Sequence, residues 1–267
     1  MFKPLINIYN RCLYILKVNF GLDFKKCIQS LMNIKRFVLE YYYFKKNYDK
    51  LIKFNPSLND YNENAGDENS EYFINDLFIA QKIYNDNPAV LLDIGSRLDG
   101  YIAHVASFRE ISVLDIRPYK SRIHNIFFHQ ADLMKSIPKK FHNYADYITC
   151  IHSLEHFGLG RYGDTLNPDG YKLGLKNISK ILKKNGTFVF SVPIGKECVE
   201  FNSHRIFNPF MLIDLMSSYG FKIINFFYLD KNKIIESTNY INTFNLISNK
   251  RYVLGTFIMI KIDEYEK

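Results

Sequence analysis

The sequence has no tryptophan and only four cysteines, and it lacks the patterns that assign an enzyme class directly. Cys12, Cys27, Cys150 and Cys198 are far apart with no paired spacing, which argues against a disulfide framework and against a zinc site. Free thiols in a reducing compartment are the simplest interpretation, and they predict a cytoplasmic protein. No spacing typical of metal ligands occurs, so we expect no metal. The fingerprint GxGxxG is absent, which disfavours a dehydrogenase.

Long apolar runs are missing as well. Residues 1–22 are apolar but interrupted by Lys3, Arg11 and Lys17, so no stretch reaches the roughly 18 uninterrupted apolar residues of a membrane span. No small-residue cleavage site follows, so we expect no secretory signal. Apolar side chains are nevertheless abundant: 47% of the 267 residues are hydrophobic, with 20 Tyr and 23 Phe. This is enough for an aromatic-rich α/β domain with an appendage.

The charge of the chain is concentrated at its N-terminus. The formal net charge is +8, and residues 1–53 hold 11 Lys or Arg against 3 Asp or Glu, whereas the remaining residues hold 24 of each. The charge-balanced remainder therefore gives no indication of nucleic-acid binding. The basic segment shows no recognised nucleic-acid motif either, so we expect no nucleic-acid partner.

A basic amphipathic helix is predicted over residues 24–46, with Asp23 as its N-cap. Its apolar side chains recur at helical spacing, and its lysines and arginines fall largely elsewhere. Such a helix suits an anionic membrane surface or a membrane complex, which would make the protein peripheral on the inner face of the membrane. It equally suits packing on the domain or on a partner, with a basic face in solvent. Both interpretations stay open.

The composition divides the chain into three parts. Residues 1–53 form the basic helical extension, and residues 54–70 are polar, acidic and turn-rich, which predicts a linker. The third part, residues 71–267, is expected to form the domain, beginning with a helix over residues 72–85. A later helix is expected from Asn208 and Pro209, because that pair suits a helix N-terminus.

Short apolar runs alternate with helical patterns in the middle of the chain, and acids recur at their ends. The runs begin near Val90, Ile111, Ile126, Tyr144 and Gly186. The first enters a turn bounded by two glycines, followed at once by a helical pattern. Such alternation predicts a parallel sheet with ligands at the carboxyl ends of its strands. Two final strands are expected over residues 221–229 and 251–262, separated by the polar stretch 230–250.

Residues 70–262 resemble the class I S-adenosylmethionine-dependent methyltransferases. The resemblance implies an α/β, Rossmann-like fold with a mostly parallel seven-stranded sheet, helices on both faces, an antiparallel pair at the end, and S-adenosylmethionine as cofactor. More closely, the chain is similar to an uncharacterised, DUF268-like family associated with bacterial surface-polysaccharide gene clusters. The matching stretches are residues 93–100, 103–110, 155–164 and 201–207.

The resemblance also implies the cofactor-binding residues. Asp93 and the glycine turn would hold the methionine part, Asp115 the ribose and Asp132 the adenine. His152 would pack against the adenosine or the methionine. The complete set is Asp93, Gly95, Ser96, Arg97, Gly100, Asp115, Ile116, Asp132, Leu133 and His152. Arg97 departs from the family pattern, because a glycine is common there; it would either pair with the cofactor carboxylate or repel the sulfonium.

Catalytic candidates lie in the loops that follow the fourth and fifth strands. His156 or His204 is the expected base, with His152 and Glu155 as further candidates, and Arg161 or Arg205 would clamp an anionic or polyhydroxylated acceptor. The expected activity is O-methylation of a sugar or glycan precursor. Two alternatives stay open: a non-catalytic or repurposed protein of this fold acting in glycan assembly at the membrane, and an enzyme doing other nucleotide-linked chemistry.

Overall fold

The computed structural model describes residues 3–66 and 70–262, with side chains from residue 9 onward. The chain divides into two compact units, Met1–Asp67 and Glu68–Lys267. The two units are described separately below.

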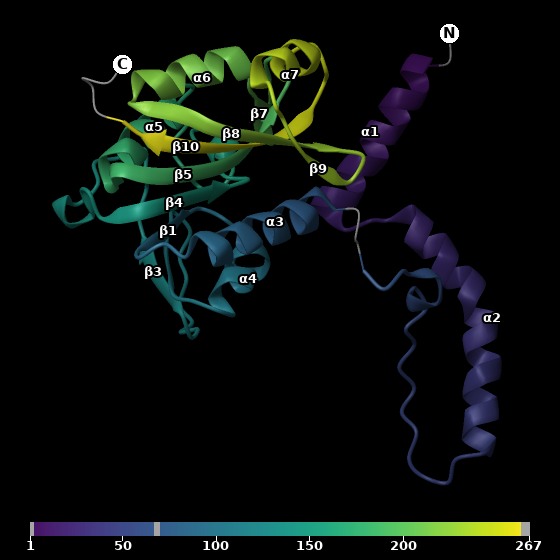
Figure 1. The fold of residues 1–267 in the computed structure, drawn as a ribbon. Helices are drawn as coiled ribbons and strands as arrows, with labels where there is room; N and C mark the ends of the chain where they lie inside the picture. The colour runs from purple at the N-terminus through teal and green to yellow at the C-terminus, as the bar shows by residue number, and fades with distance from the viewer. Residues whose placement is uncertain (1–2, 67–69, 263–267) are drawn as a thin grey trace. The chain divides into compact units, whose positions relative to one another are not determined.

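The first unit consists of two helices and a returning segment. Helix α1 spans Lys3–Phe20, helix α2 spans Phe24–Lys46, and a short 3-10 helix, η1, spans Asp60–Asn62 (Figure 1). The Asp23 carboxylate accepts a hydrogen bond from the Lys26 backbone N–H at 3.1 Å. The predicted helix over residues 24–46 and its N-cap are thereby confirmed.

The segment that follows α2 folds back along it. The Phe54 ring packs edge-on against the rings of Phe37 and Tyr41, with centroids 5.2 and 5.4 Å apart. Farther along, the Asn33 side chain donates to the Leu58 carbonyl at 2.8 Å. The first part of the predicted linker is therefore packed on α2, yet no residue of α2 is buried.

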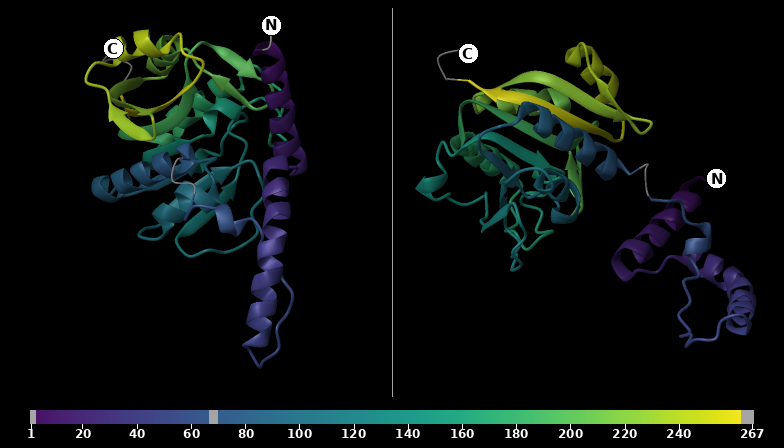
Figure 2. Two further views of the ribbon diagram at one scale, coloured as in Figure 1. Left: turned by 90° about the vertical axis from the view of Figure 1, so that its right-hand side faces the viewer. Right: turned by 60° about the horizontal axis from the view of Figure 1, so that its bottom comes forward.

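The second unit is built on an eight-stranded sheet with the strand order β3-β2-β1-β4-β5-β10-β8-β9 (Figures 1 and 2). The strands are β1 Leu91–Ile94, β2 Ile111–Asp115, β3 Ile126–Gln130, β4 Ala145–Ile151, β5 Leu182–Ile194, β8 Phe221–Asp230, β9 Lys233–Glu236 and β10 Val253–Lys261. The first five run parallel, and β10 lies antiparallel between β5 and β8. The predicted Rossmann-like sheet with a terminal antiparallel pair is confirmed.

The prediction was wrong about the stretch 230–250, which holds an eighth strand and a helix. Strand β9 pairs with β8 through a hairpin whose turn residues, Lys231 and Asn232, have φ values of 44° and 64°. Such a left-handed pair is the geometry of a tight hairpin turn. Helix α7, Tyr240–Ile247, is capped by the Asn239 side chain. Short edge strands and one-sided short helices have weak periodicity, so the polar composition concealed both.

Helices cover both faces of the sheet. Helices α5 (Gly170–Ile181), α6 (Pro209–Ser218) and α7 bury apolar side chains on one face. Helix α3 (Glu71–Asp86), the kinked turn η2 (Leu98–Ile102) and the short α4 (Ala103–Ala106) bury theirs on the other. The first face contains the expected aromatic core: Phe190 stacks on Phe188 and on Phe257, with centroids 4.9 Å apart in both pairs.

Two loops at the carboxyl edge follow β4 and β5. The loop that follows β4 ends where helix α5 begins, at Gly170. The segment after β5 forms a small hairpin of β6 (Cys198–Glu200) and β7 (His204–Ile206). The hairpin places Ser203 and His204 beside the end of β4, because Ser203 contacts His156.

A buried polar cluster ties α3 to the sheet and generates the first prediction. The Asn75 amide donates to Ser191 Oγ at 3.0 Å and accepts from Thr256 Oγ1 at 2.8 Å. We expect Asn75→Ala to lower the free energy of unfolding by about 1–3 kcal/mol, because it leaves buried hydroxyls without a partner. Urea denaturation measures this. Gln81→Ala, at an exposed position on the same helix, is the control; equal effects of the two variants would contradict the prediction.

Candidate active site

A cavity of about 480 Å³, including its open mouth, lies at the carboxyl ends of the parallel strands. Segments following β1, β2, β3 and β4 all contribute to its wall. Among its lining residues are Gly95, Asp115, Ile116, Asp132, Leu133, His156 and Tyr162. Below it is called the main cavity. Carboxyl ends of neighbouring parallel strands are where α/β sheets bind ligands.

The buried carboxylate of Asp93 fixes the turn that follows β1. The buried Asp93 carboxylate accepts hydrogen bonds from the Ser96 N–H and hydroxyl at 3.0 and 2.7 Å, and from Thr149 Oγ1 at 2.7 Å. Burial raises the pKa of Asp93 to about 6, while these hydrogen bonds act to lower it. Since protein groups occupy its oxygens, Asp93 shapes the turn and does not line the main cavity.

Two glycines are required by the turn. Gly95 has a φ of 71°, and a Cβ atom there would lie 2.2 Å from Ser153 Oγ. At Gly100 a Cβ atom would lie 2.6 Å from an Asp76 carboxylate oxygen. Only glycine therefore allows α3 and the segment after β4 to approach the turn this closely.

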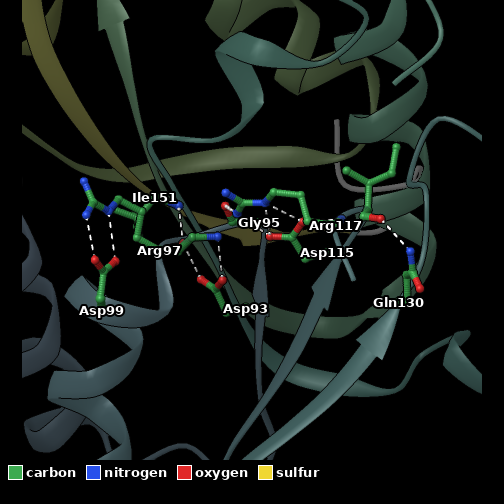
Figure 3. A network of polar contacts seen from close by, with 10 residues as sticks. Asp93, Gly95, Arg97, Asp99, Asp115, Arg117, Gln130 and Ile151 are labelled. Carbon is green, nitrogen blue, oxygen red and sulfur yellow. Dashed lines mark hydrogen bonds and ion pairs between the residues drawn. The ribbon is translucent and has the colours of Figure 1, made fainter. Parts of the chain in front are cut away.

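Arg97, the departure from the family pattern, points away from the main cavity. Its Nε and Nη2 atoms donate to the two carboxylate oxygens of Asp99 at 3.0 and 2.8 Å, and both side chains are mostly exposed (Figure 3). The pair lines a neighbouring, more open hollow. Arg97 therefore leaves the glycine turn accessible.

Asp115 is covered by an arginine that the sequence reasoning missed. Arg117 Nη2 lies 2.5 Å from Asp115 Oδ2, and its Nε and backbone N–H donate to Oδ1 at 2.9 and 2.8 Å (Figure 3). The guanidinium also lies 4.8 Å from the Tyr162 ring and donates to the Gly95 carbonyl at 3.3 Å. The signal available in the sequence was an arginine two residues after a strand-ending acid.

The remaining wall is formed after β3. Asp132 Oδ1 accepts the Met134 N–H at 2.9 Å, and Asp132 Oδ2 lies 3.5 Å from Lys135 Nζ. The buried Asn177 amide donates to the carbonyls of Leu133 and Lys135, which fixes this loop. Five of the ten predicted cofactor residues therefore line the main cavity: Gly95, Asp115, Ile116, Asp132 and Leu133.

His152 lies beside α3 instead. Its φ is 52°, its ring centroid is 4.4 Å from that of Tyr72, and its Nε2 lies 3.3 Å from the Asn75 amide nitrogen. Burial lowers the pKa of His152 to about 4, so the ring is neutral near pH 7. Since the amide donates to Nε2, the proton is assigned to Nδ1.

Glu155 and His156 form a buried pair directly after β4. His156 Nδ1 lies 2.7 Å from the Ser203 carbonyl oxygen, so Nδ1 carries the proton and Nε2 carries the lone pair. Nε2 lies 3.7 Å from Glu155 Oε1, while Glu155 Oε2 has no hydrogen-bond partner among the described residues. Burial raises the pKa of Glu155 to about 8, and burial with the charge of Arg161 lowers that of His156 to about 3. Near neutral pH the pair is therefore largely uncharged.

Arg161 and His204 both contact Ser203. Arg161 Nη1 donates to the Ser203 carbonyl at 2.8 Å, and its guanidinium lies 5.2 Å from the Tyr162 ring. His204 Nδ1 lies 3.0 Å from Ser203 Oγ. Both side chains are partly exposed at the carboxyl edge, where an acceptor can reach them.

Arg205 was predicted to clamp the acceptor, but its side chain faces the protein interior. The buried guanidinium donates to the carbonyls of Phe157 and Pro168 at 2.5 and 3.1 Å and lies 5.0 Å from the Tyr171 ring. Its hydrogen bonds are committed to the main chain, so we reassign Arg205 from acceptor clamp to a residue that positions the loop after β4. No cluster of three or more potential metal ligands occurs within residues 3–66 and 70–262.

Comparison with known proteins gives one family match. The model of the family described as Caenorhabditis protein of unknown function, DUF268, matches residues 101–262, which is more than half of the chain. A comparison with curated proteins found no match.

Solved structures with a similar fold are distant in sequence. One is the 1,6-didemethyltoxoflavin-N1-methyltransferase of Burkholderia thailandensis, solved with S-adenosylhomocysteine, at 15% identity, covering 70% of this chain and 79% of that chain with a TM-score of 0.47. Another is an S-adenosylmethionine-dependent methyltransferase of Clostridium acetobutylicum, at 15% identity, 84% and 99% coverage and a TM-score of 0.48. A third, the [4+2]-cyclase SpnF, has 14% identity, 70% and 79% coverage and a TM-score of 0.49.

The Glu155 carboxyl generates a prediction about pH. Its pKa is raised in the folded state, so between the ordinary glutamate value and about 8 the folded chain holds a proton that the unfolded chain releases. Stability therefore falls as pH rises through this window. Glu155→Gln removes this contribution to the pH dependence. The free energy of unfolding of the variant relative to that of wild type should therefore increase by on the order of a few kcal/mol between about pH 5 and pH 9.

Urea denaturation across that range measures the effect. Glu110→Gln, at an exposed glutamate, is the matched control and should follow the wild-type pH profile. If Glu155→Gln also follows that profile, the buried carboxyl is ionised throughout.

Proposed function

The chain belongs to the DUF268 family of proteins of unknown function, and we propose that it is an S-adenosylmethionine-dependent methyltransferase acting on a hydroxyl group of a sugar or glycan precursor. The observation that carries the proposal is the convergence of a left-handed glycine turn, two strand-ending acids and apolar walls on one cavity. The turn comes from β1, and the acids, Asp115 and Asp132, come from the ends of β2 and β3.

The residues of the main cavity fit the parts of this cofactor. Gly95 lines the main cavity without a side chain, so a ligand there meets the backbone of the turn. The Asp115 carboxylate is an acceptor suited to the two hydroxyls of a ribose. Ile116 and Leu133 supply apolar surface for a base.

The Arg117 side chain must move before a ribose can bond the Asp115 carboxylate. Its fork occupies both oxygens of Asp115, so a diol can bond the carboxylate only by replacing those hydrogen bonds. The Tyr162 ring, 4.8 Å from the guanidinium, and the Gly95 carbonyl offer the displaced side chain other partners. Cofactor binding is thereby coupled to a change in the Arg117 side chain.

Bound in this cavity, S-adenosylmethionine supplies a methyl group that its sulfonium has already activated. The task left to the chain is to align the acceptor and to take up the hydroxyl proton as the new carbon–oxygen bond forms. We assign the proton uptake to the ionised form of Glu155. Its unbonded oxygen can accept the hydroxyl proton, and with a pKa of about 8 the ionised fraction grows as the pH approaches that value.

His156 is assigned to positioning. Both of its ring nitrogens face protein groups, Nδ1 the Ser203 carbonyl and Nε2 the Glu155 carboxyl, so the ring orients Glu155. Ser153 and His156 line the main cavity, and Glu155 lies between them in the sequence. Arg161 and His204 are assigned to the acceptor.

The acceptor is expected to be rich in hydroxyls. The Tyr72 ring packs on His152 with centroids 4.4 Å apart, and the Tyr252 ring lies edge-on to His204 at 6.1 Å. The Tyr252 hydroxyl donates to Glu71 at 2.6 Å, which adds further polar groups to this side. The sugar assignment rests on these groups and on the resemblance to a family associated with polysaccharide gene clusters.

A non-catalytic protein of the same fold is the competing hypothesis. The observation in its favour is that Arg117 already satisfies Asp115. In that case the ion pair would serve stability, and the main cavity would not take a nucleoside.

The next prediction concerns S-adenosylhomocysteine affinity, measured by titration calorimetry without an acceptor. We expect wild type to bind, Asp115→Asn to bind at least about tenfold more weakly because a carboxylate acceptor is lost, and Arg117→Gln to bind about tenfold more tightly because a competitor is removed. Arg97→Gln, which breaks the exposed pair with Asp99, is the matched control and should leave the affinity unchanged. Absence of binding by both wild type and Arg117→Gln would favour the non-catalytic hypothesis.

A further prediction separates Glu155 from the cofactor site. With nucleotide sugars and glycan precursors as acceptors, Glu155→Gln should lower kcat by roughly 10²–10⁴-fold because proton uptake is lost. Its affinity for S-adenosylhomocysteine should stay at the wild-type value. Methyl transfer is followed by mass spectrometry of the product. Unchanged transfer by a folded Glu155→Gln variant would remove Glu155 as the base.

A further inference from the structure

The first unit exposes apolar side chains that its own fold does not cover. The segment after α2 lies against one side of that helix, where Ser30 bonds Asn59 at 2.8 Å and Phe37 packs on Phe54. The opposite side carries Phe24, Ile28, Leu31, Met32, Leu39 and Tyr42, each between 51% and 74% exposed. We call these six residues the apolar stripe.

The apolar stripe follows one face of α2, and Lys35 lies within it between Met32 and Leu39. The six apolar residues follow one another at intervals of four, three, one, seven and three residues, which places them on a single face of a helix with 3.6 residues per turn. Large apolar side chains that gather on one exposed face mark a site of contact.

Positive charge accompanies the apolar stripe. Lys26 and Arg36 are paired with Glu63 and Glu40, whereas Lys25, Lys35 and the Lys45–Lys46 pair are exposed without an ion pair among the described residues. The whole formal excess of +8 lies in residues 1–53. No helix among the described residues is long and apolar enough to cross a membrane.

These features distinguish between the occupants that could cover the stripe. A second copy of the chain would bring one strongly basic segment against another, which is electrostatically unfavourable. A nucleic acid would neutralise the lysines and leave the apolar side chains in water. An anionic lipid surface suits both the apolar side chains and the lysines, because acyl chains accept the apolar stripe while acidic headgroups attract the lysines.

We propose that α2 docks the protein on an anionic membrane surface, with the apolar stripe at the boundary between headgroups and acyl chains. The helix lies in the plane of the interface and does not span it. This inference is independent of the proposed methyl transfer, because it uses no residue of the second unit.

The absence of tryptophan from the chain makes a direct test available. In the full-length protein, Met32→Trp places a single fluorophore in the apolar stripe, and Leu246→Trp places one at an equally exposed position, 73%, on α7. With vesicles of phosphatidylcholine and phosphatidylglycerol, emission from the Met32→Trp protein should move to shorter wavelength and be quenched by brominated acyl chains. Emission from Leu246→Trp should stay unchanged, as should both with phosphatidylcholine alone.

Flotation with the same vesicles tests the two forces separately. The double variant Leu31→Glu/Met32→Glu should reduce the floated fraction about tenfold, since charges would have to enter the apolar boundary. Met211→Glu/Leu246→Glu alters exposed apolar residues of the second unit and is the matched control. Lys25→Glu/Lys35→Glu, or added salt, should weaken binding by weakening headgroup attraction.

Three results would overturn the proposal. Equal binding to neutral and anionic vesicles would remove the role of the lysines. Emission shifts at position 32 that depend on protein concentration and not on vesicles would show that a second copy covers the stripe. No flotation and no shift, with unfolding midpoints like that of wild type, would show that the stripe has no lipid partner.

Discussion

The arrangement of the candidate site depends on the hydrogen bonds that the buried Asp93 carboxylate accepts. Three donors from Ser96 and Thr149 fix the chain where it leaves β1. The Ser96 hydroxyl also accepts a hydrogen bond from the Ile151 N–H of β4 at 3.1 Å. The turn is thereby tied to two neighbouring strands. Gly95 is held in its left-handed conformation against Ser153, and the main cavity opens beside it.

Two further carboxyl groups at this edge have opposite electrostatic surroundings. Asp115 is paired with a bidentate arginine. Glu155 is buried beside a neutral histidine with one oxygen unbonded, which favours its protonated form. A carboxylate that faces hydrogen-bond donors suits ligand binding, and an acid whose pKa lies near neutrality suits proton transfer. The two environments together support division of the edge into a cofactor side and an acceptor side.

The first unit differs from the second in how little apolar surface it buries. No side chain that the structure describes in its two helices is buried, and its contacts include a cap, hydrogen bonds and aromatic edges. A small segment of this kind has little apolar burial to offset its conformational entropy. A surface that covers the apolar stripe would supply the missing burial, which links the sparse packing of this unit to the exposure of its apolar side chains.

The sequence by itself determined the succession of elements, the acids and glycines at the strand ends, the cap of α2 and the confinement of positive charge to residues 1–53. These features depend on local periodicity and composition, which are properties of neighbouring residues. What each side chain faces depends on the tertiary structure. Arg205 bonds carbonyls 37 and 48 residues earlier in the chain, and one carboxyl oxygen of Glu155 is buried without a hydrogen-bond partner among the described residues. Burial and hydrogen-bond pairing are set by where distant segments meet, so residue types and spacing predicted which groups reach the carboxyl edge but not their roles there.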